Sequence, residues 1–135
     1  MRARYVLDSY ALLAYLKDEQ GAEEVQRLLA EAERGPAQTL MSVVNLGEVL
    51  YITERHRGLE EAQRIAGLIE QLPIEVIDVG RGLTFRAAHV KANQPISYAD
   101  AFAVALAQEV GATVVTGDPE FARVEHLVPV QWIAR

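Results

Sequence analysis

The sequence contains no cysteine, so disulfide bonds and metal sites built from thiolates are excluded. It also has no apolar run approaching the roughly 20 residues that a membrane-spanning helix needs, and its first residues show no signal-peptide pattern. We therefore expect a cytoplasmic protein with no membrane contact. Internal repeats and low-complexity segments are absent as well. Histidine is scarce, and none of the three has the paired spacing typical of metal ligands: His56, His89 and His126.

The sequence does contain enough apolar residues for a core. It has 135 residues and is 50% hydrophobic, which predicts one globular domain over residues 1–135. The formal net charge of −6 argues against a general phosphate-neutralising surface, but it leaves nucleic acid open as a partner if metal ions and local basic residues supply the attraction. For any single basic residue, solvated surface charge is a more common role than a phosphate contact. The candidates for phosphate contacts are Arg55, Arg57, Arg81, Arg86 and Lys91.

Segments with strand character alternate with segments of helical periodicity along the chain. This alternation predicts an α/β fold with three layers, in which helices cover both faces of a central, mainly parallel twisted sheet. The predicted strands are residues 5–8, 38–41, 74–79, 112–116 and, as an edge strand, 128–133. The predicted helices are residues 10–16, 21–32, 43–55, 59–71, 83–91 and 98–110.

Four acidic residues stand inside or at the end of apolar segments, where an unpaired carboxylate is costly. Asp8 ends a predicted strand and Asp118 lies just past the end of another, while Glu48 and Asp100 lie in the first or second turn of predicted helices. Because parallel strands end at one edge of a sheet, all four side chains are expected to converge there. Crowded carboxylates repel each other, and a hard divalent cation with oxygen ligands, Mg²⁺ or Mn²⁺, relieves that repulsion.

Three of these acids also have a purely structural interpretation. Asp100 resembles the acidic partner in a capping box that begins at Ser97, although Glu or Gln is the usual residue there. Asp8 would cap the first helix, but Ser9 could cap it equally well. Asp118 would cap the short segment that follows its Asp-Pro turn. The sequence alone leaves these alternatives open.

Glu48 is the least expected of the four, because it stands in the middle of a helix among valines and leucines. Asn45 lies three residues earlier and therefore on the same helical face. The glutamate could extend to solvent or pair with an arginine, and the sequence leaves both explanations open as alternatives to a functional role.

The acids belong to four short motifs in a fixed order along the chain. They are VLDS at residues 6–9, NLGE at 45–48, SYADA at 97–101 and VTGDPEF at 115–121. In this order and spacing the whole chain resembles a PIN domain, and within that family it is most similar to the VapC-type toxins of bacterial and archaeal toxin–antitoxin pairs.

The resemblance implies a Mg²⁺-dependent endoribonuclease that hydrolyses RNA phosphodiester bonds as the toxin of a type II toxin–antitoxin system. It also implies a homodimer and a cognate antitoxin whose tail blocks the site. Mn²⁺ is a plausible substitute for Mg²⁺. The implied acidic, catalytic and metal-binding residues are Asp8, Glu48, Asp100 and Asp118, and the implied substrate-binding residues that line the site are Ser9, Asn45 and Thr116.

The chemistry of phosphodiester hydrolysis fits these residues independently of the family. Metal ions bound by carboxylates can activate a water, stabilise charge on the phosphoryl oxygens and assist the leaving oxygen. We expect Asp8 and Asp100 to be direct ligands because both project from rigid element ends. Asp118 and Glu48 would complete the site directly or through water, or orient the attacking water.

Two other enzyme or signalling classes lack a residue that they require. A haloacid-dehalogenase-like phosphatase needs a second aspartate two residues after the first, and Tyr10 stands there instead. A receiver-like Mg²⁺-binding domain needs a lysine late in the chain, and the last lysine is Lys91. A catalytically silent PIN-like domain that only binds a partner stays open, and an assay of RNA cleavage separates it from the enzyme.

Overall fold

The computed structural model describes residues 2–133, in which strands and helices alternate as the sequence predicts. The five strands of this part form one sheet in the order β3-β2-β1-β4-β5, and every neighbouring pair is parallel. The predicted α/β class is confirmed, and the predicted last strand lies at an edge. The strands are β1 (Ala3–Leu7), β2 (Ala37–Ser42), β3 (Ile74–Ile77), β4 (Thr113–Thr116) and β5 (Val130–Trp132).

The helices match the predicted segments, with ends that move by a few residues. Gly111 ends the sixth α-helix with a positive φ of 68°, as expected for a glycine after a helix C-terminus. Residues 119–124 form a 3₁₀ helix, η1. The helices are α1 (Ser9–Leu16), α2 (Ala22–Arg34), α3 (Val43–Arg57), α4 (Leu59–Glu70), α5 (Arg81–Asn93), α6 (Tyr98–Val110) and η1 (Pro119–Val124).

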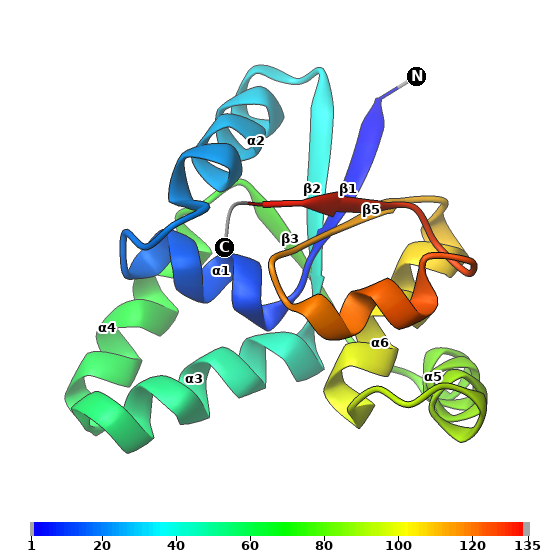
Figure 1. The fold of residues 1–135 in the computed structure, drawn as a ribbon. Coiled ribbons are helices and arrows are strands. Elements are labelled where there is room, and N and C mark those ends of the chain that lie inside the picture. The colour runs from blue at the N-terminus through cyan, green and yellow to red at the C-terminus, as the bar shows by residue number, and fades with distance from the viewer. Residues whose placement is uncertain (1, 134–135) are drawn as a thin grey trace.

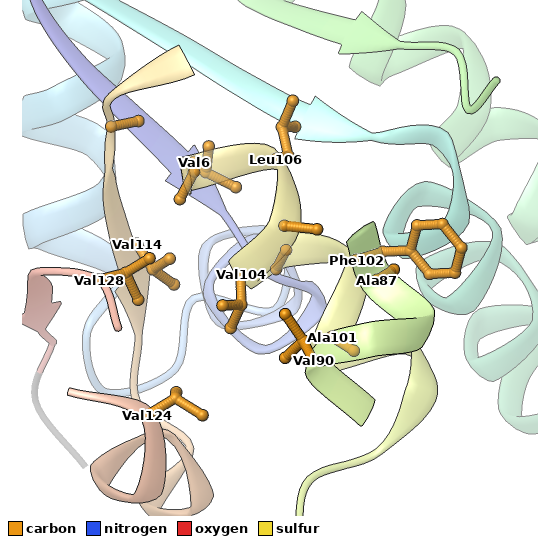
Figure 2. Packing of buried hydrophobic residues seen from close by; sticks show 14 of the residues in the cluster. Val6, Ala87, Val90, Ala101, Phe102, Val104, Leu106, Val114, Val124 and Val128 are labelled. Carbon is orange, nitrogen blue, oxygen red and sulfur yellow. The ribbon is translucent and has the colours of Figure 1, made fainter. Parts of the chain in front are cut away.

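Both faces of the sheet are apolar, because successive residues of each central strand point to opposite sides. Val6 and Val114 pack in a cluster with α5, α6 and η1, as Figure 2 shows. Leu7 and Val115, the next residues along the same strands, pack in a second cluster with α1 and α2. The sheet is therefore the middle of three layers, as predicted (Figure 1).

The helix α6 is the most deeply buried of the helices. All residues from Asp100 to Ala107 are buried, and alternating alanines let its backbone come close to β1, β2 and β4. α5 packs along its outer side, and α3 contacts it from another direction. The first turn of α6, which carries Asp100, is thereby fixed against the sheet.

Sheet topology fixes the location of the predicted site. The chain runs from β1 outward to β2 and β3 and then crosses back to β4 on the other side of β1, which makes the edge at β1 and β4 the kind of switch point where open α/β sheets bind ligands. Leu7 pairs with Val115, so the next residues, Asp8 and Thr116, lie at one level. The first turns of α1, α3, α6 and η1 gather at this carboxyl end of the sheet, in the lower centre of Figure 1.

The described helices include none that is both long and apolar enough to cross a membrane. The predicted domain of residues 1–135 includes residues 1, 134 and 135, which lie outside the described part, so its bounds stay a prediction. The three histidines, His56, His89 and His126, are all exposed.

Candidate metal centre

Asp8 occupies the junction between β1 and α1 and is only 1% exposed. Its Oδ1 accepts a hydrogen bond from the Ala11 backbone N–H at 2.8 Å, so Asp8, and not Ser9, caps α1. Burial raises the pKa of Asp8 from 3.8 to about 8, and the charges of Asp100 and Asp118 add to the increase. Asp8 is therefore both a cap and a buried acid that neighbouring carboxylates destabilise when it is charged.

Thr116 at the end of β4 connects two of the predicted acids. Its hydroxyl donates to Asp8 Oδ2 at 2.5 Å and accepts from the Asp118 backbone N–H at 2.9 Å. The bond to Asp8 opposes the increase in pKa, because it stabilises the charged carboxylate. Thr116 is fully buried, so it orients both aspartates without itself reaching the surface.

Asp100 lies in the first turn of α6 and is 7% exposed. Ser97 caps this helix, and its Oγ accepts from the Asp100 backbone N–H at 3.1 Å. Within residues 2–133 the Ser97 backbone N–H donates no hydrogen bond to the Asp100 carboxyl, so the capping box is incomplete. Burial is the main cause that raises the pKa of Asp100 to about 7, and the negative charges of Asp118, Glu48 and Glu120 add to it. A hydrogen bond with the Ser97 side chain acts in the opposite direction and lowers this pKa.

The closest carboxylates belong to Asp100, Asp118 and Glu120, whose oxygens can all lie within 4.8 Å of one another. Asp118 caps η1, and its Oδ1 accepts from the Glu120 backbone N–H at 3.0 Å. Glu120 was not among the predicted site residues. The sequence feature that could have indicated Glu120 is its position two residues after Asp118 in the VTGDPEF motif. The tight 3₁₀ turn that follows Asp118 brings the Glu120 side chain back toward the sheet edge.

Glu48 is half-buried in the second turn of α3, and its charge contributes to the raised pKa of Asp100. It does not belong to the closest group of carboxylates. Neither of the two ion pairs found among residues 2–133 involves it, so the alternative of pairing with an arginine is not observed. Glu48 thus faces the acidic site from the side of α3.

Gly117 precedes Asp118 and lies directly against the ring of Tyr10. A Cβ atom at this position would be 2.4 Å from Tyr10 Cε1, so a side chain there would displace the ring. Tyr10 is 39% exposed and lies in the first turn of α1, beside the acidic cluster. The glycine therefore allows η1 to start close to α1.

The remaining predicted residues, Ser9 and Asn45, are buried and bonded to each other. The Ser9 hydroxyl donates to the Asn45 backbone oxygen at 3.1 Å. Asn45 is fully buried, and Ser9 is 5% exposed. In this arrangement Asn45 can affect a substrate only through the groups it supports, and the predicted substrate contacts of both residues stay a prediction.

The residues at this edge fit a hard divalent cation. All of the convergent side-chain donors are carboxylate oxygens, which Mg²⁺ and Mn²⁺ prefer. The raised pKa values of Asp8 and Asp100 show that the ionised cluster is unfavourable without a compensating positive charge. Arg123 comes within 3.4 Å of Glu120, but its side chain is 53% exposed. It therefore offsets the charge of Glu120 at the surface and not that of the buried aspartates.

A separate groove of about 400 Å³ lies between α1, α3 and α4. Apolar residues such as Leu13, Leu16, Ile52 and Ile65 line it together with charged ones. None of the predicted acidic or substrate-binding residues contributes to this groove, so it is distinct from the acidic edge. Arg57, a candidate for phosphate contacts, lines this groove instead.

Comparison with solved structures agrees with the fold. A chain of VapBC2 from Rickettsia felis bound to a DNA fragment from its promoter is 20% identical, with 96% of this chain and 98% of that chain covered and a TM-score of 0.74. VapC20 from Mycobacterium tuberculosis, described as a Sarcin-Ricin loop cleaving toxin, is 21% identical over 87% of this chain and 92% of its own, with a TM-score of 0.69.

A third similar structure is DNA-bound VapBC from Salmonella typhimurium, at 19% identity, coverage of 96% and 97%, and a TM-score of 0.73. No curated protein matches the sequence significantly. The family model for the PIN domain matches residues 5–127, a range that includes all four motifs and every predicted site residue. The chain belongs to the PIN domain family.

Proposed function

We propose that this PIN domain is a Mg²⁺-dependent endoribonuclease that hydrolyses RNA phosphodiester bonds. The observation that carries the proposal is the convergence of acids from β1, α3, α6 and η1 at one sheet edge, where Asp8 and Asp100 have raised pKa values. RNA is favoured as the substrate because a structurally similar chain is described as a Sarcin-Ricin loop cleaving toxin.

The residues that would bind the metal ion are the four predicted acids together with Glu120. Of the four predicted acids, Asp100 and Asp118 are the best candidates for direct metal ligands, because their carboxylate oxygens lie closest together, in one group with those of Glu120. When bound, Mg²⁺ would supply a positive charge that neutralises the phosphoryl oxygens and lowers the pKa of water.

The chain's own residues would fix the orientation of the reacting groups. Thr116 holds Asp8 and the backbone of Asp118 in place through its single hydroxyl. Glu48, half-buried and outside the closest carboxylate group, would orient the attacking water from the α3 side. Ser9 and Asn45 would contribute to substrate binding indirectly, since both are buried.

We also propose that the protein acts as the toxin of a type II toxin–antitoxin pair and binds a cognate antitoxin. The support is that several similar structures are described as VapBC or as a toxin–antitoxin complex. A homodimer is proposed because large apolar side chains remain exposed on the helices. They include Tyr51, Leu59, Leu68, Phe85 and Tyr98.

The enzyme proposal is tested with purified protein and RNA. Single-stranded and structured RNAs are incubated with the protein in Mg²⁺, in Mn²⁺ and in EDTA. We expect cleavage with either metal and none in EDTA. RNA that stays intact in all three conditions would instead favour the catalytically silent, partner-binding alternative. Light scattering at micromolar concentration tests the dimer separately, and a monomer would contradict it.

A further inference from the structure

Asn45 occupies the place where the first turns of α1, α3 and α6 meet. It is fully buried in the first turn of α3. Its Nδ2 donates to the backbone oxygen of Ala99 in α6 at 3.1 Å and to Ser9 Oγ in α1 at 3.5 Å. Its Oδ1 accepts from the Ser42 hydroxyl at 2.9 Å. The side chain thus uses both its donor and its acceptor inside the protein.

Each partner of Asn45 adjoins an acid of the candidate metal centre. Ser9 directly follows Asp8, and Ala99 directly precedes Asp100. Glu48 comes three residues after Asn45, on the same face of α3. One buried amide therefore connects the backbone segments that carry three of the acids.

Asn45 also links α3 to both neighbouring helices by hydrogen bonds. Among residues 2–133, the hydrogen bonds that join α3 to α1 and to α6 all involve either its side chain or its backbone oxygen. The other contacts of α3 with these helices come from side-chain packing, which is not directional. Packing keeps helices together, but hydrogen bonds fix their register and rotation.

We propose that Asn45 is a positioning residue for the metal centre. By bonding to both neighbouring helices, it sets the relative placement of Asp8, Glu48 and Asp100, so that their carboxylates reach one cation together. This inference rests on the proposed function only in that the acids bind a divalent metal. Groups that orient ligands in this way contribute to metal affinity as well as to folding.

An amide is the side chain that this place requires. Leucine has a similar size but neither donor nor acceptor, so it would leave the Ser42 hydroxyl and the Ala99 oxygen without these partners. Aspartate would accept from Ser42 but could not donate to Ala99. The test therefore uses Asn45→Leu, which keeps volume and removes the bonds.

The measurement is Mn²⁺ affinity, followed through the electron paramagnetic resonance signal of the free ion. Thr53→Val is the matched control, because Thr53 is buried on the same helix and donates to the Val49 backbone oxygen at 2.8 Å, within α3. Both variants lose buried hydrogen bonds and should melt at lower temperature. We expect Asn45→Leu to bind Mn²⁺ about 10- to 100-fold more weakly, and Thr53→Val to bind it like the wild type.

A second variant covers the case in which Asn45→Leu does not fold. Ser9→Ala removes one of the two inter-helix links and only one oxygen atom, and it should weaken Mn²⁺ binding severalfold. Wild-type affinity in the folded variants, or equal weakening by Thr53→Val, would overturn the positioning role. If the wild type itself binds no Mn²⁺, the metal site fails, and with it the proposed function.

Discussion

Carboxyl groups at the sheet edge and on the surface of α4 differ in what balances their charge. On α4, Glu61 pairs with Arg64 at 2.8 Å, and this hydrogen bond lowers the pKa of Glu61. At the sheet edge, Asp8 and Asp100 are buried, and the pKa of each is raised. The same chemical group is therefore stabilised as an anion in one region and destabilised in the other.

The difference shows how the chain distributes its positive charge. An exposed ion pair such as that of Glu61 neutralises itself locally and contributes little to folding. Among residues 2–133, the one arginine paired with an acid of the sheet edge is Arg123, at 3.4 Å from Glu120 and half exposed. Buried acids that the chain does not neutralise are a costly arrangement, which a cation from solution would offset.

The largest effect is expected from neutralising an acid at the sheet edge. Asp100→Asn removes a charge from the closest carboxylate group and should reduce RNA cleavage in Mg²⁺ by about 100-fold or more, the cost of losing a group that stabilises a transition state. Asp8→Asn should act in the same direction. Cleavage rates are measured by gel with the same RNA for each variant.

Glu61→Gln on α4 is the matched control for this experiment, since it also neutralises one carboxylate. It should leave the cleavage rate unchanged, because Glu61 is paired on the surface with Arg64. Near wild-type cleavage by Asp100→Asn would remove that residue from the metal centre. A large loss in Glu61→Gln would show that net charge, and not the local site, controls the reaction.

A smaller effect concerns stability and metal binding together. Mg²⁺ at 100 times its Kd would stabilise the folded wild type by about 2.7 kcal/mol, a shift of several degrees in Tm for a domain of this size. In EDTA, Asp100→Asn should melt at or above the wild-type temperature, because it relieves repulsion, and it should lose most of the shift in Mg²⁺.

Thermal unfolding of both proteins, each in EDTA and in millimolar Mg²⁺, checks this prediction. A carboxylate that served only as a helix cap would behave in the opposite way. Its loss would cost on the order of 1 kcal/mol with or without metal, and the full Mg²⁺ shift would remain. That outcome would mean that Asp100 is a helix cap and not a metal ligand.

Strand ends and helix caps made much of the site predictable from sequence. Asp8 and Asp118 follow apolar strand residues, and parallel strands end at one edge, so their proximity followed from topology. Asp100 followed from the cap at Ser97, which fixes where α6 begins. These inferences depend on local patterns that a sequence displays directly.

Contacts between distant elements were not predictable in the same way. Glu120 joins the closest carboxylates because a 3₁₀ turn follows Asp118, and the helix type cannot be deduced from a six-residue segment. Asn45 bonds to Ala99, 54 residues away, and no periodicity in either helix encodes that bond. Thr116 was expected to line the site, but its hydrogen bond to Asp8, 108 residues away, was not predicted.

A further prediction concerns how the stability of the fold depends on pH. The folded protein binds protons at Asp8 up to a pKa of about 8 and at Asp100 up to about 7, whereas both release them near 3.8 when unfolded. Between these values the folded state holds more protons, so the free energy of unfolding falls as pH rises. The groups that face these two carboxyls, Asp118, Glu48 and Glu120, reinforce this direction.

We therefore expect the wild type in EDTA to melt at a lower temperature at about pH 9 than at pH 5.5, with the decrease still continuing through pH 8, because the pKa of Asp8 lies at about 8. Asp100→Asn should lose its share of the decrease, while Glu61→Gln should keep all of it, because the pKa of Glu61 is lowered and that group is already ionised across this range. Mg²⁺ competes with protons for the same oxygens, so its stabilising effect should grow with pH. Equal pH dependence in the wild type and in Asp100→Asn would mean that Asp100 is ionised throughout, and the sheet edge would then resemble the surface of α4.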